Sequence, residues 1–573
     1  MYVEKVPNRS SPPAILLREG WREGKRTCKR TLANLTHWPP EQIESLRRVL
    51  KGETLVSIEE VFAVERSLPH GHVEAVLGIV RKLGVEKMLS SRRCRERDLV
   101  LGMLVEQLIH PCSKLATTRM WHTTTLAEEL SIGDADEDAL YEALDWLLER
   151  QGRIEGKLAK RHLSEGGLVL YDVSSSYYEG HTCPLVQYGH DRDKKKGKPI
   201  VVYGVMTDPA GRPVAVDVYP GNTGDPTTVP DQVEKLRKRF GLSRVVLVGD
   251  RGMLTQTQIK HLKAYPGVGW ISALRSPAIR KLVESGALQM SLFDHQSLAE
   301  IVSPEYPGER LVACLNPLLR DERRRKREAL LGMTASALEK IAGDVARRTK
   351  KPLGKDEIGL KVGKIINRFK VGKHFQLRIE DGHFAWERDE ASIRREEALD
   401  GIYVIRTSEP RKRLSAENAV RQYKSLSRVE RLFRTLKGID LRVRPIRHRT
   451  EAHVRAHIFL CVLAYYVEWH MRQALAPLLF HDEELDADRK VRDPVAPARP
   501  SASARRKKAK RVREDGLPVH SFETLLRALA TRCRNMCRMK SAPAGVTIEQ
   551  LTEPTRLQAR AAELLAAYPV GEH

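Results

Sequence analysis

The sequence has few cysteines and no apolar run long enough to span a membrane. Its eight cysteines are scattered among 573 residues without a Cys-x-x-Cys pair, so we expect neither a zinc ribbon nor a disulfide scaffold. The longest clearly apolar run, 458–467, is much shorter than the ~20 residues that cross a bilayer. The N-terminal MYVEKVPNRSSPP lacks the apolar segment of a secretory signal. We therefore expect a cytoplasmic protein without a membrane partner.

Acidic residues are outnumbered by basic ones. The chain carries 99 Lys+Arg against 74 Asp+Glu, a formal net charge of +25. A strongly basic protein attracts polyanions, and nucleic acid is the first candidate because each phosphate contact releases condensed counterions. Ribosomal, chromatin-like and nuclease functions share this balance. A basic surface without any nucleic-acid role is the alternative that charge alone leaves open.

The N-terminal region, residues 1–160, is expected to be mostly helical. Apolar residues recur at nearly helical spacing in 97–110, and again in 136–155. The basic stretch 22–30 (REGKRTCKR) suits contact with DNA, and it suits a solvated arm equally well. We expect this region to help bind DNA.

An α/β pattern begins after Gly167. The continuous apolar run LVLY ends on Asp172, and the run RVVLVG ends on Asp250. Both runs are typical of central strands that are buried on two faces. Asp225 and Pro226 are expected to open a helix, with Asp225 as its N-cap. The strands predicted in this region are 168–171, 199–208, 212–222, 244–250 and 267–275.

The α/β core is interrupted and then resumes. Residues 285–400 are expected to form an inserted β-rich subdomain, in which Asp381-Gly382 between alternating arms predicts a hairpin. The core thus comprises 165–284 and 401–475. Residues 481–515 are expected to be a charged, Pro-rich linker, and residues 516–573 a helical tail.

Three acidic residues carry the chemical interpretation. Asp172 and Asp250 stand at the ends of two expected central strands, and Glu430 lies in a basic amphipathic helix. Carboxylates brought together in this way bind divalent metal, which serves in-line displacement at phosphate. Taken singly, each residue has a plainer explanation: a strand-end Asp often only forms a turn, and Glu430 alone is a solvated helix charge.

The chain resembles the DDE transposases of bacterial insertion sequences, especially the IS-four superfamily. The resemblance rests on YDVSSSYY, PGNTGDPTT, VVLVGDRGM and YKSLSRVERLFRTLK, and it covers roughly 165–470. It implies an α/β fold with a ribonuclease-H-like mixed-sheet core and a β-strand insertion. It also implies Mg²⁺ or Mn²⁺ as cofactor, double-stranded DNA as partner and a homodimer in the synaptic complex. Such a protein is associated with the bacterial nucleoid when it acts.

The resemblance assigns roles to single residues. Asp172, Asp250 and Glu430 match the three catalytic, metal-binding acids. The family's Tyr-Arg-Glu-Lys signature departs at its arginine, where Leu426 stands. Lys437 lies two helical turns beyond Glu430, a position suited to holding a phosphate. The residues expected to bind DNA phosphates are Tyr423, Arg428, Arg431, Arg434 and Lys437.

The function that follows is transposition. We expect binding to terminal inverted repeats and to target DNA, and Mg²⁺-dependent strand cleavage and strand transfer. A ribonuclease-H-fold nuclease or resolvase without strand transfer is one alternative, and an inactive DNA-binding derivative is another. Asp191 and Asp193 lie in a Lys-rich loop and are expected to be surface charges.

Overall fold

The computed structural model describes the chain except for residues 10, 54–61, 181, 295, 540–546 and 570–573. The chain divides into two compact units. The first joins Met1–Leu68 to Arg532–Glu553, and the second joins Pro69–Thr531 to Pro554–His573. Among the described residues, no helix combines the length and the apolar composition that a membrane crossing requires.

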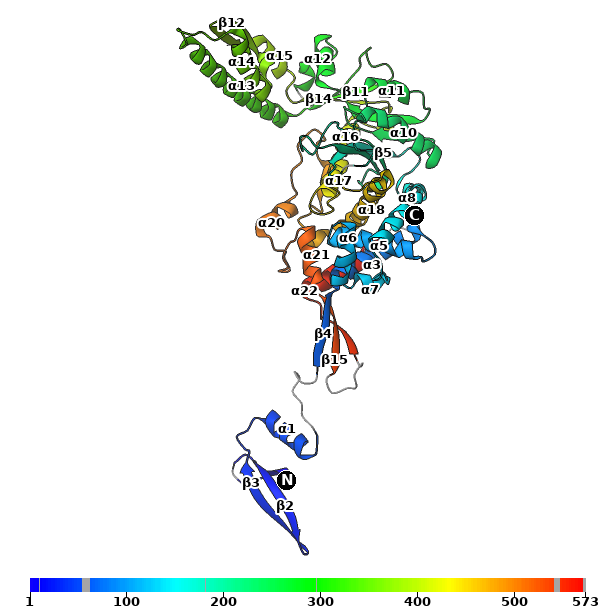
Figure 1. Ribbon diagram of the computed structural model, residues 1–573, viewed down its shortest axis with the longest axis vertical. Helices are drawn as coiled ribbons and strands as arrows, with labels where there is room; N and C mark the ends of the chain where they lie inside the picture. Colours follow the sequence, from blue (N-terminus) through cyan, green and yellow to red (C-terminus); the bar gives the residue numbers. More distant parts are fainter. Residues whose placement is uncertain (10, 54–61, 181, 295, 540–546, 570–573) are drawn as a thin grey trace. The chain divides into compact units, whose positions relative to one another are not determined.

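The first unit is built mainly from strands. An antiparallel sheet in the order β1-β2-β3 is followed by one helix, and a second sheet has the order β16-β15-β4. Both sheets are labelled in part in Figure 1. The elements are β1 (Tyr2–Val6), β2 (Ala14–Glu23), β3 (Arg26–Asn34), α1 (Pro40–Leu50), β4 (Phe62–Pro69), β15 (Cys533–Met539) and β16 (Thr547–Leu551).

These strands correct two expectations. Residues 1–160 are not helical from their start, because β1 to β3 precede the first helix. The tail 516–573 is not helical throughout, because it contributes β15 and β16. The alternation that normally announces strands is weak here, since β3 is exposed along almost its whole length and carries charge on both faces.

The remainder of the N-terminal region is helical, as predicted, and belongs to the second unit. Its helices share one hydrophobic core with the long helix α18 (Glu451–Ala474), which contacts both α5 and α8. They are α3 (Gly71–Lys82), α4 (Val85–Leu89), α5 (Arg95–Ile109), α6 (Lys114–Met120), α7 (Leu126–Leu130), α8 (Glu137–Glu149) and α9 (Gln151–His162). The boundary expected near residue 160 therefore does not separate two independent bodies.

An eight-stranded mixed sheet forms the centre of the second unit. Its order is β10-β11-β14-β9-β8-β5-β6-β7. β5, β6 and β7 pair antiparallel, whereas β5, β8 and β9 are parallel neighbours. The strands are β5 (Leu168–Tyr177), β6 (Ile200–Thr207), β7 (Pro213–Pro220), β8 (Val245–Val248), β9 (Val268–Ala273), β10 (Leu298–Ile301), β11 (Arg310–Leu315) and β14 (Ile402–Thr407). The structure confirms the predicted core strands and adds β10 and β11 to the same sheet.

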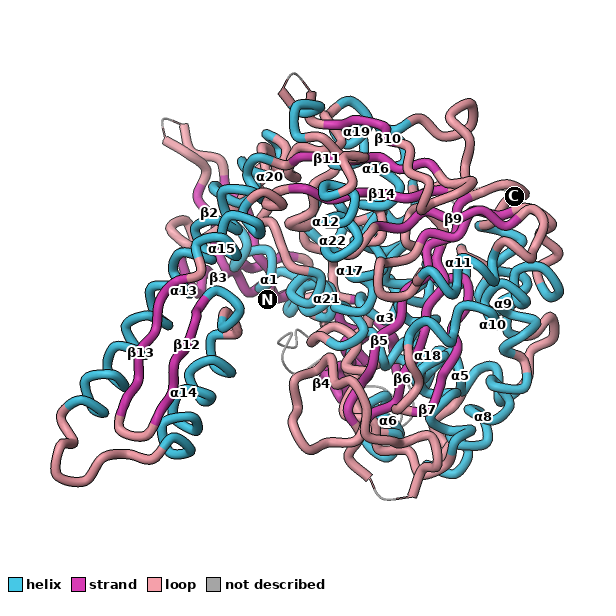
Figure 2. The backbone as a smooth tube through the Cα atoms, turned by 90° about the horizontal axis from the view of Figure 1, so that it is seen from above, coloured by secondary structure: helices cyan, strands magenta, loops and turns pink. Residues whose placement is uncertain are grey.

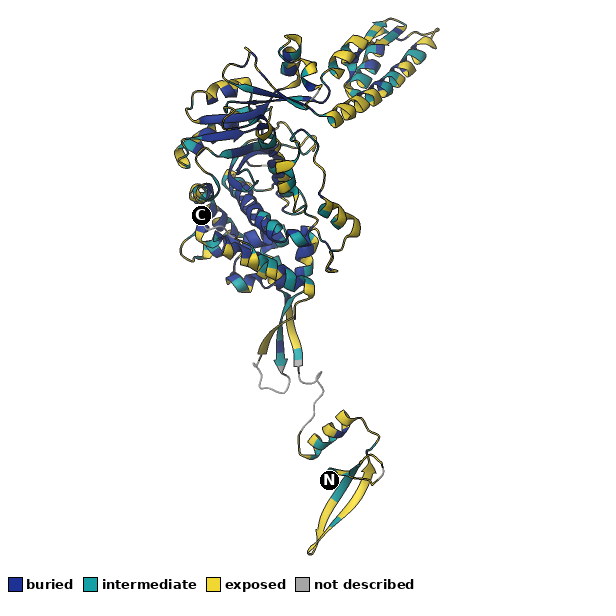
Figure 3. Ribbon diagram, turned by 180° about the vertical axis from the view of Figure 1, so that it is seen from behind, coloured by how far each residue is buried: buried dark blue, intermediate teal, exposed yellow. Residues whose placement is uncertain are grey.

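Helices cover both faces of this sheet. One face packs against α16 (Ala416–Lys424), α17 (Ser427–Lys437) and α18. The other face packs against α10 (Val229–Glu234) and α11 (Gln256–Leu262), with Trp270 of β9 in the same cluster. Figure 3 draws the sheet and α18 mostly as buried. The chain from 416 to 474 thus consists mainly of three helices.

The inserted segment is mainly helical, which corrects the expected β-rich subdomain. The predicted hairpin exists, with the turn at Asp381-Gly382, where Gly382 has a φ of 69°. Figure 2 shows this hairpin between two longer helices, and the segment has its own hydrophobic core. Its elements are α13 (Pro317–Ala346), α14 (Lys355–Phe369), β12 (Phe375–Glu380), β13 (His383–Arg388) and α15 (Glu390–Glu397), preceded by α12 (Ser276–Glu284).

The expected linker 481–515 is ordered by contacts with the core. It holds α19 (Leu485–Val491) and α20 (Ala502–Lys510), and α21 (Phe522–Ala530) and α22 (Arg556–Ala567) follow. The Lys507 ammonium donates a hydrogen bond to the carbonyl oxygen of Ala476 at 3.1 Å. A basic composition predicted a mobile segment, but here Lys507 binds backbone carbonyl groups just beyond the end of a core helix.

Candidate active site

The sheet brings Asp172 and Asp250 to the same level. Leu170 of β5 pairs in parallel register with Val248 of β8, and each aspartate follows two residues later. Because side chains alternate along a strand, Asp172 is directed to the face of the sheet that carries Leu170. That face is the one covered by α17. Asp250 lies just beyond the end of β8, at the same level. The predicted strand end at Asp172 is wrong, because β5 continues to Tyr177. Asp172 within β5 and Asp250 just beyond β8 nevertheless lie beneath one helix.

Burial and mutual repulsion perturb the Asp172 carboxyl group. Burial raises the pKa of Asp172 to about 7, and the negative charge of Asp250 adds to this rise. The backbone N–H of Val173 opposes it by donating to Asp172 Oδ1 at 2.8 Å. Asp250 is exposed, and its Oδ1 accepts hydrogen bonds from the N–H groups of Gly252 and Met253 at 2.9 and 2.7 Å.

Glu430 belongs to the same electrostatic environment. It is exposed in the first turn of α17, and its carboxylate takes part in no ion pair or hydrogen bond with any described residue. The pKa of Tyr423, at the end of α16, shows that Glu430 lies nearby. Burial raises the pKa of Tyr423 to about 12, and each of the three candidate carboxylates contributes to the rise. All three acids therefore lie near one phenol.

The donor set fits a divalent cation, but the three carboxylates do not yet share one position. Oxygen ligands are those that Mg²⁺ and Mn²⁺ take in proteins, and a bound cation would relieve the repulsion between Asp172 and Asp250. Within the described part of the chain, no three His, Cys, Asp or Glu residues are close enough to hold a metal ion. The exposed side chain of Glu430 forms no ion pair with a described residue, so it is the carboxylate that is free to move towards Asp172 and Asp250.

An ion pair of Arg192 with Asp225 adjoins Asp172. Arg192 Nη2 contacts both oxygens of Asp225. Beyond the effect of burial, Arg192 lowers the pKa of Asp172 and Asp225 raises it. Asp225 is not the helix N-cap that the sequence suggested, because Gly224 occupies that position and Asp225 begins the short helix itself. The Asp225 side chain is instead bound to arginine.

Lys437 is held by a buried aspartate. Its Nζ lies 3.0 Å from Oδ1 of Asp193, which Arg444 also contacts. The Asp193 side chain is only 1% exposed, so the expectation of a surface charge is wrong. Burial lowers the pKa of Lys437, while Asp193 opposes the shift. Lys437 is therefore ion-paired in this structure rather than open to a phosphate.

The three arginines of α17 line a separate cavity. Arg428, Arg431 and Arg434 border a cavity of about 930 Å³ that none of the three candidate acids lines. Arg428 Nη2 lies 2.5 Å from Asp486 of α19, and its other terminal nitrogen donates to the carbonyl of Pro209. The helix thus presents Glu430 and the arginines to different surroundings.

Two family models match the sequence. The sequence model of the transposase DDE domain matches residues 167–467, which is more than half of the chain. That of the N-terminal domain of IS1634 family transposases matches residues 3–59. The chain belongs to the DDE transposase family. As a DDE transposase it is a metal-dependent, DNA-cleaving enzyme.

Other comparisons are distant. The transposase is similar to one solved structure described as "Cryo-EM structure of piggyBac transposase synaptic complex with hairpin DNA". The identity is 11%, the alignment covers 80% of this chain and 77% of that one, and the TM-score is 0.33. No curated protein matches the transposase.

Sequence reasoning missed three charged residues of the transposase that surround its candidate acids. Arg192 and Asp193 come from a loop and Asp225 from the start of a short helix, and only folding brings these segments to β5 and α17. The Lys-rich run that follows Asp193 predicts a solvent-exposed loop. One signal was available, because HDRD places a single arginine between two acids before four cationic residues.

Proposed function

We propose that the chain is the transposase of an IS1634-type insertion sequence. It binds the terminal inverted repeats, cleaves a strand at each element end and transfers the freed 3′-OH to target DNA. The observation that carries this proposal is the parallel register that sets Asp172 and Asp250 side by side under the helix of Glu430. We assign catalysis to these three acids.

We propose that the core has the ribonuclease-H-like arrangement. Three antiparallel strands, β5 to β7, are followed by β8 and β9, which extend the sheet in parallel on the other side of β5. Asp172 then lies within the first strand of this pattern, and Asp250 follows the fourth. The insert enters between β9 and β14, before the helix that carries the third acid.

Asp172, Asp250 and Glu430 would hold divalent metal, Mg²⁺ or Mn²⁺. When bound, such ions activate an attacking hydroxyl group and stabilise the leaving oxygen of an in-line displacement at phosphorus. The Asp172 carboxyl group must lose its proton to serve as ligand, and the neighbouring Arg192 favours that loss. Half-buried Tyr423 packs against the core and is close enough to all three acids to feel their charge.

The remaining residues bind and orient DNA. Arg431 and Arg434 line an open cavity and form no ion pair with another described residue, so we assign them to phosphates. Arg428 and Lys437 reach DNA only by exchanging Asp486 and Asp193, respectively, for a phosphate. Two element ends have to be joined in one reaction, and we therefore propose a homodimer in the synaptic complex, formed in the bacterial cytoplasm.

An oligonucleotide that carries the element end tests the assignment. Asp172→Asn, Asp250→Asn and Glu430→Gln should each reduce metal-dependent cleavage by about 10³-fold or more, which corresponds to roughly 4 kcal/mol in the barrier. Glu417→Gln is the matched control, since Glu417 is an exposed glutamate in the first turn of neighbouring α16. Cleavage that survives in Asp172→Asn overturns the assignment.

Product analysis separates transposition from simple cleavage. A transposase joins the cleaved end to a second duplex, whereas a nuclease or resolvase leaves no such joined product. Joined product that disappears with Asp250→Asn supports the proposal. Cleavage without any joining, at both Mg²⁺ and Mn²⁺, favours the nuclease.

A further inference from the structure

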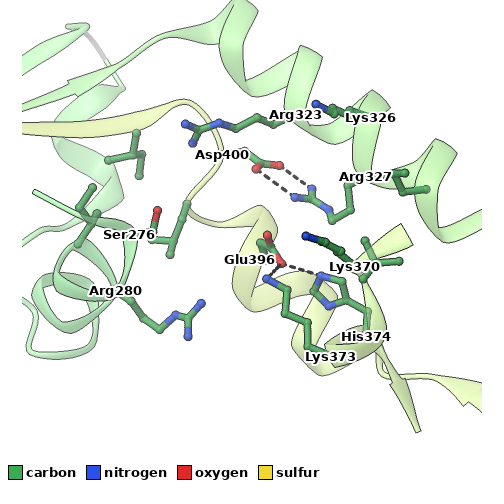
Figure 4. A pocket seen from close by; sticks show the side chains of 15 residues that line it. Ser276, Arg280, Arg323, Lys326, Arg327, Lys370, Lys373, His374, Glu396 and Asp400 are labelled. Carbon is green, nitrogen blue, oxygen red and sulfur yellow. Dashed lines mark hydrogen bonds and ion pairs between the residues drawn. The ribbon is translucent and has the colours of Figure 1, made fainter. Parts of the chain in front are cut away.

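A basic cavity lies where the inserted segment joins the core. Its volume is about 400 Å³, and its walls come from α12, α13, the end of α14 and the connection from α15 to β14 (Figure 4). We call it the root cavity. Its cationic lining residues are Arg280, Arg323, Lys326, Arg327, Lys370 and Lys373.

The carboxylates of the root cavity are already engaged. Asp400 binds buried Arg327 through two hydrogen bonds of 3.0 and 2.5 Å. Glu396 lies 2.7 Å from Lys373 Nζ and 2.6 Å from His374 Nε2. Two acids thus face six Lys and Arg side chains. The acids fix the floor of the cavity and leave most of its positive charge without compensation.

Four of the cations have no partner within the described part of the chain. The side chains of Arg280, Arg323, Lys326 and Lys370 form no ion pair or hydrogen bond with a described residue, although they come from three separate elements. Figure 4 shows them around the Arg327–Asp400 pair. Gathering like charges is unfavourable unless an anion joins them.

Two local features add to this picture. The Nε of Arg327 is buried and has no hydrogen-bond acceptor, and such an unmet donor destabilises the free state. Lys370 adopts a left-handed conformation with a φ of 56° at the end of α14, a position where glycine is usual. The chain keeps a cation there in spite of the strained backbone.

We propose that the root cavity binds phosphate groups of the DNA on which the transposase acts, and this rests on the proposed function. Arginine recognises phosphate through its planar fork, and lysine adds a compact charge. A volume of about 400 Å³ is at the small end of ligand pockets. It admits a phosphodiester with its sugars and excludes a duplex, so the strand backbone passes over its mouth. Such contacts position DNA and read no sequence.

Salt dependence of binding tests the root cavity in the full chain. Arg323→Gln/Lys326→Gln removes two cations of α13 that line it, and Arg324→Gln/Arg325→Gln removes two exposed neighbours that do not. The affinity for an end duplex is measured by fluorescence anisotropy over a range of salt concentrations. We expect the first variant to lower the slope of log K against log salt by about 1 to 2, near 0.9 per lost contact. The control should change it by less than about half a unit.

Several outcomes overturn the proposal. Equal slopes for the two variants indicate a general basic surface, and an unchanged slope indicates no contact. A further experiment measures the binding of inorganic phosphate at matched ionic strength. If equilibrium dialysis shows it bound to the unsubstituted chain and lost from the first variant, while DNA slopes stay equal, the cavity serves a free anion instead.

A measurement without substitution gives a second readout. Bound DNA should protect Lys370 from an amine-reactive reagent at least fivefold more than Lys364, an exposed lysine of α14 outside the cavity. Equal protection overturns the proposal. All binding is repeated in Asp172→Asn. If the Arg323→Gln/Lys326→Gln change still lowers the salt slope in Asp172→Asn, but Asp172→Asn still cleaves DNA, only the catalytic assignment is wrong. If Asp172→Asn abolishes cleavage but the salt slope does not change, only the root-cavity proposal is wrong.

Discussion

At the scale of single residues, Asp172 combines a functional position with an electrostatic cost. Its pKa is raised to about 7 by burial and by Asp250. A carboxyl group with a raised pKa in the folded chain stabilises the fold below its unfolded value, near 4. This contribution is lost as the pH rises through about 7. The metal-free fold is thus less stable when Asp172 is in the ionised form that binds metal.

Asp172→Asn should therefore stabilise the metal-free chain while it abolishes cleavage. At pH 8 in chelator we expect a gain of about 2 kcal/mol in the free energy of unfolding, less than the ~4 kcal/mol that three pKa units represent, because the carboxylate is only half-buried. The gain should shrink as the pH falls from 8 towards 4. Urea unfolding at both ends of this range measures it. A variant that is no more stable than the parent at pH 8 contradicts the electrostatic account.

Asp193→Asn should have the opposite effect on stability. It leaves Lys437 and Arg444 without their buried counter-charge, and breaking such a pair costs roughly 3–5 kcal/mol. A double-mutant cycle with Lys437→Met isolates the pair, and we expect a coupling of about 1–3 kcal/mol. Additive effects of the two substitutions show that Asp193 does not hold Lys437.

The residues of the site differ in how well the sequence predicts their surroundings. The proximity of Asp172 and Asp250 was predictable because buried apolar runs mark neighbouring central strands. The continuation of β5 beyond Asp172 to Tyr177 was not predicted. Arg192, Asp193 and Asp225 were not predicted either, since such a residue acquires its partner only from tertiary structure. Lys437 had the expected spacing from Glu430, but spacing along a helix does not reveal an acid contributed by another element.

At the scale of elements, apolar runs predicted the core strands and charge obscured the rest. The insert is the clearest case. The basic run 321–332 predicts a helix by itself, and α13 extends well beyond it, with the buried residues Leu331, Leu338, Ile341 and Val345 at helical spacing. The Asp-Gly hairpin was correctly predicted, and it gave the whole segment a β-rich interpretation. A local turn signal fixes two strands and says nothing of the helices that pack on them.

The insert's separate core predicts local unfolding. Leu338 is fully buried in a cluster that shares no residue with the clusters covering the eight-stranded sheet. Leu338→Ala should cost about 2–5 kcal/mol and should speed hydrogen exchange in α13, α14 and the hairpin. Amides of β5 and β8 should keep their protection.

Leu247→Ala is the matched control for that experiment. Leu247 is fully buried in β8 within a cluster on the sheet, so its truncation should speed exchange in β5 and β8 and leave the insert unchanged. Hydrogen exchange followed by mass spectrometry resolves these segments. If both substitutions accelerate exchange uniformly, the insert and the core unfold as one cooperative body.

At the scale of the whole molecule, the net charge is +25, and only some of the basic side chains form ion pairs. In the unit that contains β1 to β3, several cations pair with acids: Arg18 and Lys29 with Glu4, and Arg30 with Glu19. Arg22 and Arg26, which flank the turn between β2 and β3, have no such partner among the described residues. Beyond the residues that pair with β1, the strands β2 and β3 form a two-stranded ribbon. Such a ribbon fits the major groove of DNA, and a free arginine there reads guanine.

The ribbon therefore predicts how element ends are recognised. Arg22→Gln/Arg26→Gln should reduce the preference for an end duplex over a random duplex by about tenfold or more, since one good arginine–guanine contact discriminates by roughly 1–3 kcal/mol. Arg47→Gln/Arg48→Gln in α1 removes equal charge from residues already paired with glutamates. That control should weaken both affinities alike, because it alters only the general field. Competition binding with the two duplexes measures the ratio, and an equal loss of preference in both variants means that the ribbon supplies charge and does not read sequence.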